Sequence, residues 1–137
     1  VYGPRQRPDM AIYKFTQSIL KDRELTVFGD GEQTRDFTFI DDVVEANIRA
    51  TRSNITGEVF NIGGGSRITV NELIRVLGGK LGKNASIQYV SAQKGDVNHT
   101  WSDISRASRW LGWKPKFNIT DGLEKYVEWV ASENVIQ

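Results

Sequence analysis

Apolar residues recur at intervals of three, four and seven positions in several stretches of this chain, and that spacing is typical of amphipathic helices. Asp9 is in place to cap the first helix, and Thr69 with Glu72 three residues later forms a capping box for the third. Gly112 followed by Pro115 marks the end of the fourth. The pattern predicts helices over residues 10–22, 41–53, 70–81, 104–111 and 120–132.

The second of these helices starts with two aspartates, which favour the positive end of a helix dipole. Asp42 with Glu45 resembles a capping box. Val44 and Ile48 are four positions apart and form the apolar stripe of this helix. We therefore expect Val44 and Ile48 to pack against the rest of the fold.

Short runs rich in β-branched and aromatic residues predict strands over residues 25–28, 35–40, 58–62 and 86–90. The sequence Gly29-Asp30-Gly31 predicts a hairpin turn, because Asp-Gly is the strongest short hairpin signal. The run Val59-Phe60-Asn61-Ile62 is apolar on nearly both sides, which is typical of a strand buried in a parallel sheet. We predict one α/β domain over residues 1–137, whose strands are too few and too short to complete such a sheet alone.

Composition narrows the class of protein. The chain has 137 residues, of which 39% are hydrophobic and 26% charged, with a net charge of +1, as in an ordinary globular domain. The basic residues are dispersed and no apolar run approaches the roughly 18 residues of a membrane span, so we expect neither nucleic acid nor a membrane as partner. The absence of cysteine excludes disulfides and fits a cytoplasmic location.

One histidine, His99, cannot build a multi-histidine metal site and leaves a Ser-His-Asp triad possible only through that residue. The triple glycine at residues 63–65 precedes a helix, as in a phosphate loop, but Ile68 stands where the dinucleotide fingerprint needs its last glycine. The favoured interpretation of these glycines is a tight turn into a helix.

Two charged residues are candidates for recognising a nucleotide. Arg35 follows the glycine-rich turn and could reach a pyrophosphate with its planar fork of donors; the alternative is a salt bridge to one of the nearby carboxylates Asp36, Asp41 and Asp42. Asp96 follows a glycine in a loop and could accept hydrogen bonds from ribose hydroxyls; the alternative is a solvated turn.

The order of the motifs carries more information than any one of them. Together they closely resemble the C-terminal part of the NAD-dependent sugar-nucleotide epimerase/dehydratase family, the extended short-chain dehydrogenases. The segment Arg7-Pro8-Asp9-Met10-Ala11 is most similar to UDP-glucose and UDP-glucuronate 4-epimerases. The segments that carry the resemblance cover essentially the whole chain: residues 1–6, 25–31, 35–43, 59–63, 95–97, 103–105, 111–115 and 122–123.

The resemblance implies a small C-terminal substrate-binding lobe that lacks most of the Rossmann domain. In the family that domain holds NAD and supplies a catalytic Tyr-x-x-x-Lys. Here Tyr13 is followed directly by Lys14 and Tyr126 is followed at the fourth position by Val130, so neither tyrosine fits. We therefore expect no catalytic, cofactor-binding or metal-binding residue in this chain, and no activity from it alone. The expected partners are a UDP-sugar, the missing Rossmann half in cis or in trans, and a second copy in a homodimer of the full-length enzyme.

The resemblance also assigns substrate-binding roles. It places uracil beside Thr26 and Phe28, with Phe28 supplying an aromatic face, the diphosphate on Arg35 and the uridine ribose on Asp96.

Three further positions follow from the resemblance. Met10 and Ala11 belong to the segment that covers the substrate. Gln93 stands where the family usually has a second diphosphate arginine, and Lys94 beside it could replace that charge.

The implied function is to bind the nucleotide-diphosphate part of a UDP-sugar for an NAD-dependent 4-epimerase, an isomerase that oxidises and then reduces C4 of the sugar. Two alternatives remain open from the sequence. One is a sibling chemistry, UDP-glucuronate decarboxylase or NDP-sugar 4,6-dehydratase. The other is a nucleotide-sugar binding module without catalysis.

Overall fold

The computed structural model describes residues 1–133, and its helices follow the predicted ones to within two residues at each end. The helices are α1 (Ala11–Leu20), α2 (Ile40–Arg52), α3 (Val70–Leu81), α4 (Ser105–Leu111) and α5 (Ile119–Ser132). The strands are β1 (Leu25–Phe28), β2 (Thr34–Arg35), β3 (Ile68–Thr69) and β4 (Ile87–Val90). The α/β class is confirmed. The elements gather around two separate hydrophobic cores.

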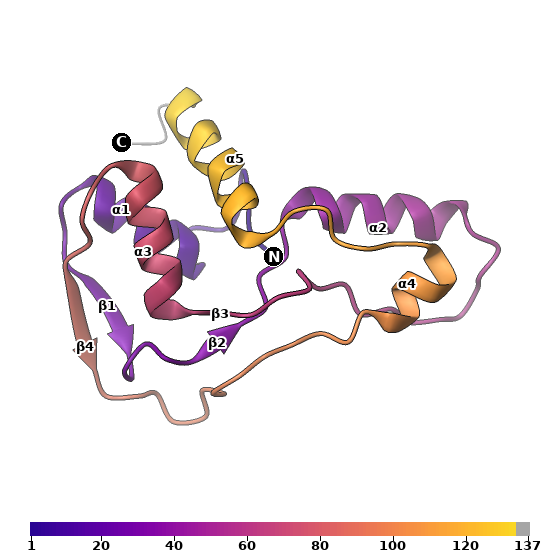
Figure 1. Ribbon diagram of the computed structural model, residues 1–137, viewed down its shortest axis with the longest axis horizontal. Coiled ribbons are helices and arrows are strands. Elements are labelled where there is room, and N and C mark those ends of the chain that lie inside the picture. Colours follow the sequence, from indigo (N-terminus) through magenta and orange to yellow (C-terminus); the bar gives the residue numbers. More distant parts are fainter. Residues whose placement is uncertain (134–137) are drawn as a thin grey trace.

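The larger core defines what we call the large lobe, which contains α1, α3, α5, β1 and β4. Figure 1 shows α1 and α3 above the two strands, with α5 beside α3. Leu73, Leu77, Leu123 and Ile12 are at most 1% exposed in this core. Their helical spacing is the reason these residues meet, because each helix turns one apolar stripe inward.

The start of α3 shows the predicted capping box. The Thr69 side chain accepts a hydrogen bond from the backbone N–H of Glu72 at 3.1 Å. At the other end Gly82 adopts a left-handed conformation with φ of 66°, which costs little without a Cβ. Both ends of α3 are therefore fixed by local chemistry that the sequence displays.

The strand pairing differs from the predicted hairpin. β1 pairs in parallel with β4, with Leu25 opposite Ile87, and β2 pairs antiparallel with β3. The turn at residues 29–31 exists, and the Asp30 carboxylate accepts from the backbone N–H of Glu32 at 3.0 Å. The hairpin prediction was wrong because β1 pairs with β4, from much later in the chain, and β2 pairs with β3.

The second core belongs to the small lobe, formed by α2, α4 and the segments at residues 58–62, 103–104 and 112–117. Ala46, Ala107 and Trp113 are buried there, and the Trp113 indole donates to the carbonyl of Asp42 at 3.0 Å. Figure 1 shows this lobe as an arm on the right, where α2 and α4 lie side by side. The small lobe buries few apolar side chains, so hydrogen bonds and ion pairs contribute a larger share of its stability than in the large lobe.

Asp42 is a buried connector and not part of a capping box. Its side chain is 1% exposed, and its carboxylate accepts from the backbone N–H groups of Lys116 at 2.8 Å and Phe117 at 3.2 Å. The N-cap of α2 is Phe39, which makes no capping bond with its side chain. The prediction was wrong because both carboxylate oxygens are used by a distant segment of the chain.

Two apolar features of the small lobe face outward, against expectation. Val44 is 49% exposed and Ile48 38% exposed, because α2 turns Asp42 and Ala46 toward Trp113 instead.

The segment at residues 58–62, predicted as a strand, has no strand beside it in the described part of the chain and adopts none. Val59 is 78% exposed. Arg106 of α4 holds this segment, donating to the carbonyl of Val59 at 3.1 Å and pairing with Glu58 at 2.8 Å. Over residues 1–133, no helix has the length and apolar character needed to cross a bilayer.

Candidate functional site

A cavity of about 250 Å³ lies between the start of α1, β1 and β2. Five of the seven residues predicted to bind substrate line it: Ala11, Thr26, Phe28, Arg35 and Asp96. They come from four separate segments of the chain, so their meeting is a product of the fold. We call this the first cavity.

The alternation of β1 places two of these side chains. Leu25 and Val27 are buried in the large core, and Thr26 and Phe28 point to the opposite side. Phe28 is 41% exposed, so an aromatic face is open to a ligand. A planar base can stack on such a face, and stacking of this kind is open to any nucleotide base.

Arg35 and Asp96 form an ion pair at 2.5 Å, with side-chain exposures of 23% and 40%. The arginine also donates to the carbonyl of Thr34 at 3.0 Å, so the guanidinium is fixed relative to β2. The predicted alternative pairing of Arg35 with Asp36, Asp41 or Asp42 is not observed. The pair presents a fork of donors and an acceptor side by side, which suits a phosphate next to a ribose.

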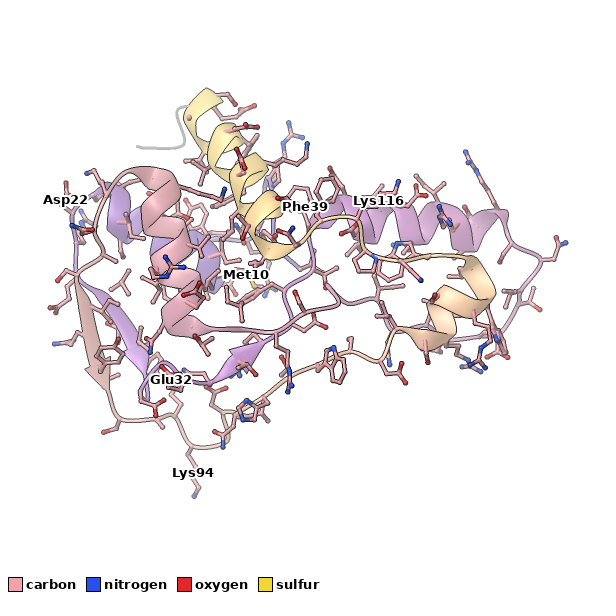
Figure 2. The ribbon with its side chains drawn as sticks, in the orientation of Figure 1. Met10, Asp22, Glu32, Phe39, Lys94 and Lys116 are labelled. Atoms are coloured by element: carbon pink, nitrogen blue, oxygen red, sulfur yellow. The ribbon has the colours of Figure 1, made fainter. Side chains whose placement is uncertain are left out.

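A turn carries Asp96 to this position. Its backbone N–H donates to the carbonyl of Gln93 at 3.1 Å, and Gly95 between them has φ of 91°, a conformation that favours glycine. Gln93 itself is exposed and does not line the first cavity. Lys94 is exposed too, and Figure 2 shows it extending outward from the edge of the molecule.

The start of α1 differs in detail from the prediction. Met10 and not Asp9 is the N-cap of the helix, and it makes no capping bond with its side chain. Asp9 instead pairs with Arg7 at 3.2 Å and lines the first cavity. Met10 contacts Arg7 through its sulfur at 3.7 Å and does not line the cavity, whereas Ala11 does.

Lys14 and Gln33 are among the lining residues that the sequence analysis did not assign to the site. Lys14 is three positions after Ala11 and therefore shares its face of α1, a signal that helical spacing supplies. Gln33 donates from its amide to the carbonyl of Phe28 at 2.7 Å, which closes the turn between β1 and β2. No local pattern marks Gln33, because its partner is set by the turn.

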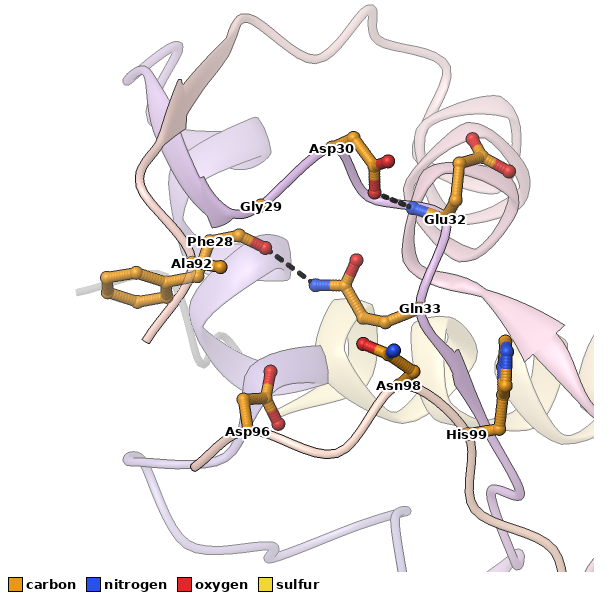
Figure 3. A pocket seen from close by; sticks show the side chains of 9 residues that line it. All are labelled: Phe28, Gly29, Asp30, Glu32, Gln33, Ala92, Asp96, Asn98 and His99. Atoms are coloured by element: carbon orange, nitrogen blue, oxygen red, sulfur yellow. Dashed lines mark hydrogen bonds between the residues drawn. The ribbon is translucent and has the colours of Figure 1, made fainter. Parts of the chain in front are cut away.

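A neighbouring cavity of about 420 Å³ shares Phe28, Gln33 and Asp96 with the first. Figure 3 shows these side chains and the hydrogen bond from Gln33 to Phe28. His99 lies on the side of the cavity opposite Phe28. His99 contacts the hydroxyl of Thr34 through Nδ1 at 2.9 Å, so this ring is tied to β2. Among residues 1–133, no group of three or more His, Cys, Asp and Glu side chains could hold a metal ion.

The carboxylate of Asp36 occupies the loop formed by the triple glycine at residues 63–65. The backbone N–H of Gly64 donates to Asp36 at 2.7 Å, and the other Asp36 oxygen accepts from the N–H of Ser102 at 3.1 Å. A Cβ on Gly63 would lie 2.5 Å from the Cβ of Ser102, so close packing requires glycine there. This loop therefore does not fit the diphosphate of a dinucleotide, and its glycines serve close packing.

The tyrosine at position 126 does not fit a proton-transfer role. It is fully buried in the large core, where its ring stacks on Trp129 at a centroid distance of 6.0 Å. Burial raises the pKa of the Tyr126 hydroxyl and keeps it protonated.

Comparison with known proteins gives consistent matches. The family described as GDP-mannose 4,6 dehydratase matches residues 1–126. A UDP-glucuronate 4-epimerase of Thermodesulfobacterium geofontis is 42% identical over 98% of this chain and 42% of its own length.

Solved structures agree. The UDP-glucuronic acid 4-epimerase of Bacillus cereus, in complex with UDP-glucuronic acid and NAD, is 40% identical with a TM-score of 0.90 over 96% of this chain and 43% of its own. The dTDP-glucose 4,6-dehydratase of Bacillus anthracis, in complex with NAD, is 28% identical with a TM-score of 0.88 over 98% of this chain and 43% of its own. The chain thus spans less than half the length of the proteins it matches.

Proposed function

This chain belongs to the GDP-mannose 4,6 dehydratase family of sugar-nucleotide epimerases and dehydratases, the extended short-chain dehydrogenases, and we propose that it binds the nucleotide-diphosphate part of a UDP-sugar for an NAD-dependent 4-epimerase.

The observation that carries this proposal is the first cavity. It combines an open aromatic face at Phe28, a fixed guanidinium at Arg35 and a carboxylate at Asp96. Those three groups complement a base, a diphosphate and a ribose respectively.

The division of labour follows from what the chain contains. Interactions with the nucleotide part position the distant sugar at the place of reaction, although the residues that make them do not take part in the chemistry there. The triple glycine is occupied by Asp36, so the proposal places NAD on residues outside this chain. The chain alone is accordingly expected to be inactive, and calorimetric titration with NAD is expected to give no saturable binding.

Arg35→Ala tests the diphosphate assignment in the complete protein that carries this chain. A charge-assisted hydrogen bond contributes about 1.5–3 kcal/mol, so the variant should bind UDP about ten- to a hundredfold more weakly. Uridine affinity should change little. Arg52→Ala is the matched control, since it removes an exposed arginine from the small lobe, and it should leave both affinities unchanged. Calorimetry at one fixed salt concentration measures all three proteins.

Equal losses for UDP and uridine would assign Arg35 to folding and not to the diphosphate. Gln93→Arg supplies a second check, because restoring the usual arginine should tighten UDP. An unchanged affinity for UDP in that variant would mean that this loop lies too far from the phosphates.

Product analysis separates the sibling chemistries. Incubated with UDP-glucuronate or UDP-glucose, an epimerase returns a nucleotide-sugar of unchanged mass that separates by chromatography. A decarboxylase releases carbon dioxide and a dehydratase releases water, and both change the mass. Binding without any product, in the complete protein supplied with NAD, would favour a non-catalytic binding module and contradict the epimerase proposal.

A further inference from the structure

Lys14 lies at one particular end of the first cavity. It also lines an adjoining cavity of about 500 Å³, and Thr26 and Phe28 line both. Arg35 and Asp96 line the first cavity and not the adjoining one. Lys14 therefore lies toward Thr26 and Phe28, on the side of the cavity away from the ion pair.

The ammonium of Lys14 is available to a ligand. The residue is exposed on α1, and within residues 1–133 no carboxylate forms an ion pair with it. By contrast, Arg35 already has Asp96 as its partner. Lys14 is thus an unpaired cation on the wall of the first cavity.

The chemistry of a pyrimidine base defines what Lys14 can recognise there. An ammonium has three donors and no acceptor, so it binds a carbonyl oxygen and not an amino group. Uracil and thymine carry a carbonyl at position 4, where cytosine carries an amino group. The 2-carbonyl lies beside the bond to ribose, whereas the 4-carbonyl points away from it.

We propose that Lys14 donates a hydrogen bond to the 4-carbonyl of the base and makes the cavity selective for uracil and thymine nucleotides over cytosine nucleotides. The proposal rests on the proposed function, since it places the base at Thr26 and Phe28 and the ribose at Asp96. With the ribose at Asp96, the edge of the base that lies farthest from Asp96 carries the 4-carbonyl. That edge faces the end of the cavity where Lys14 lies.

The test compares UDP and CDP affinities in the complete protein at one fixed ionic strength. The wild type should prefer UDP by about tenfold or more, as expected for a charged donor meeting a carbonyl. Lys14→Met keeps the length and apolar stem but removes the donors; it should weaken UDP about tenfold and CDP less than twofold. Lys14→Arg should retain most of the preference. Lys114→Met, an exposed lysine in the small lobe, should change neither affinity.

Each other outcome has one meaning. Equal weakening of UDP and CDP by Lys14→Met would assign Lys14 to the phosphates and overturn base selection. An unchanged preference for UDP in Lys14→Met would overturn it as well, while leaving the proposed function intact. A wild type that binds neither nucleotide would overturn the proposed function itself, and the inference with it.

Discussion

The two lobes are held together by different physics. The large lobe buries apolar stripes from three helices, with Leu73 and Leu123 fully inaccessible. The small lobe buries little beyond Trp113 and two alanines and relies on polar contacts made by Asp42 and by arginines. The lobe that carries the first cavity is thus stabilised mainly by apolar packing, whereas the small lobe depends more on hydrogen bonds and ion pairs.

The exposed surface of the small lobe has a common character. Val44 and Ile48 are large apolar side chains exposed on α2. Val59 is exposed on the segment that Arg106 holds. Contiguous exposed apolar surface marks an interaction site. The chain spans less than half the length of its relatives, and the family's Rossmann half is the partner that we propose for this surface.

Trp113→Ala should have the largest effect on stability and should sharpen the contrast between the lobes. Removing a fully buried tryptophan costs about 3–5 kcal/mol of unfolding free energy, and here it also breaks the bond to Asp42. Hydrogen exchange should accelerate in α2 and α4 first. Trp101→Ala, a tryptophan that is 68% exposed, is the control and should cost less than about 1 kcal/mol. Equal acceleration throughout α1 and α3 would show that the lobes unfold as one unit.

Asp42→Asn should have the next largest effect. The amide offers one acceptor where the carboxylate offered two, so one buried N–H of Lys116 or Phe117 loses its partner. A buried unsatisfied group costs about 1–3 kcal/mol. Urea unfolding of this variant is compared with Asp41→Asn, whose exposed neighbouring side chain should matter by less than about 0.5 kcal/mol. Similar losses in both variants would contradict the role of Asp42 as a buried connector.

Asp103 gives the small lobe a weak dependence on pH. Hydrogen bonds from the backbone N–H and the hydroxyl of Ser105 lower the pKa of Asp103. A lowered pKa in the folded state stabilises the fold above the ordinary pKa of aspartate, and this contribution is lost as pH falls through the lowered value. The stability advantage of wild type over Asp103→Asn should therefore shrink below about pH 4. A constant difference between pH 3 and 7 would contradict this.

The outward stripe should give the smallest change in unfolding and a clear change in association. Val44→Lys with Ile48→Lys should alter the unfolding free energy by about 0.5 kcal/mol or less per site, because both side chains are already accessible. We expect the isolated chain to self-associate through its exposed apolar surface, and sedimentation at several concentrations should show less association in the double variant. Val97→Lys places the same charge at another exposed apolar position and should not reduce association. A large loss of stability in the double variant would mean that the stripe is buried within this chain.

The sequence predicts best what depends on neighbouring residues. The box of Thr69 and Glu72 and the alternation that turns Thr26 and Phe28 outward are both local, and both are observed. The outward stripe of α2 and the unformed strand at 58–62 were mispredicted. An apolar pattern marks positions suited to burial, but it does not say whether the same chain supplies the surface that buries them.

The site divides in the same way. Arg35 is a recognisable candidate from its place after a glycine-rich turn. Its partner Asp96 is 61 positions away along the chain. The sequence alone offers three nearer carboxylates as partners for Arg35. Helical spacing places Lys14 on the same face as Ala11, but that face forms the cavity wall because α1 packs beside β1. Long-range packing, and not residue type, decides which charges meet.

The parallel pairing of β1 with β4 has a consequence for how the site comes into being. Residue 25 meets residue 87, and most of the other elements lie between them along the chain. Closing so long a loop is entropically costly, and pairings of this kind form late and slow the folding of a domain. β1 carries Thr26 and Phe28, and the loop after β4 carries Asp96. Nucleotide affinity should therefore appear only when β1 has paired with β4.

A bound nucleotide would then stabilise the fully folded chain relative to partly folded states during refolding.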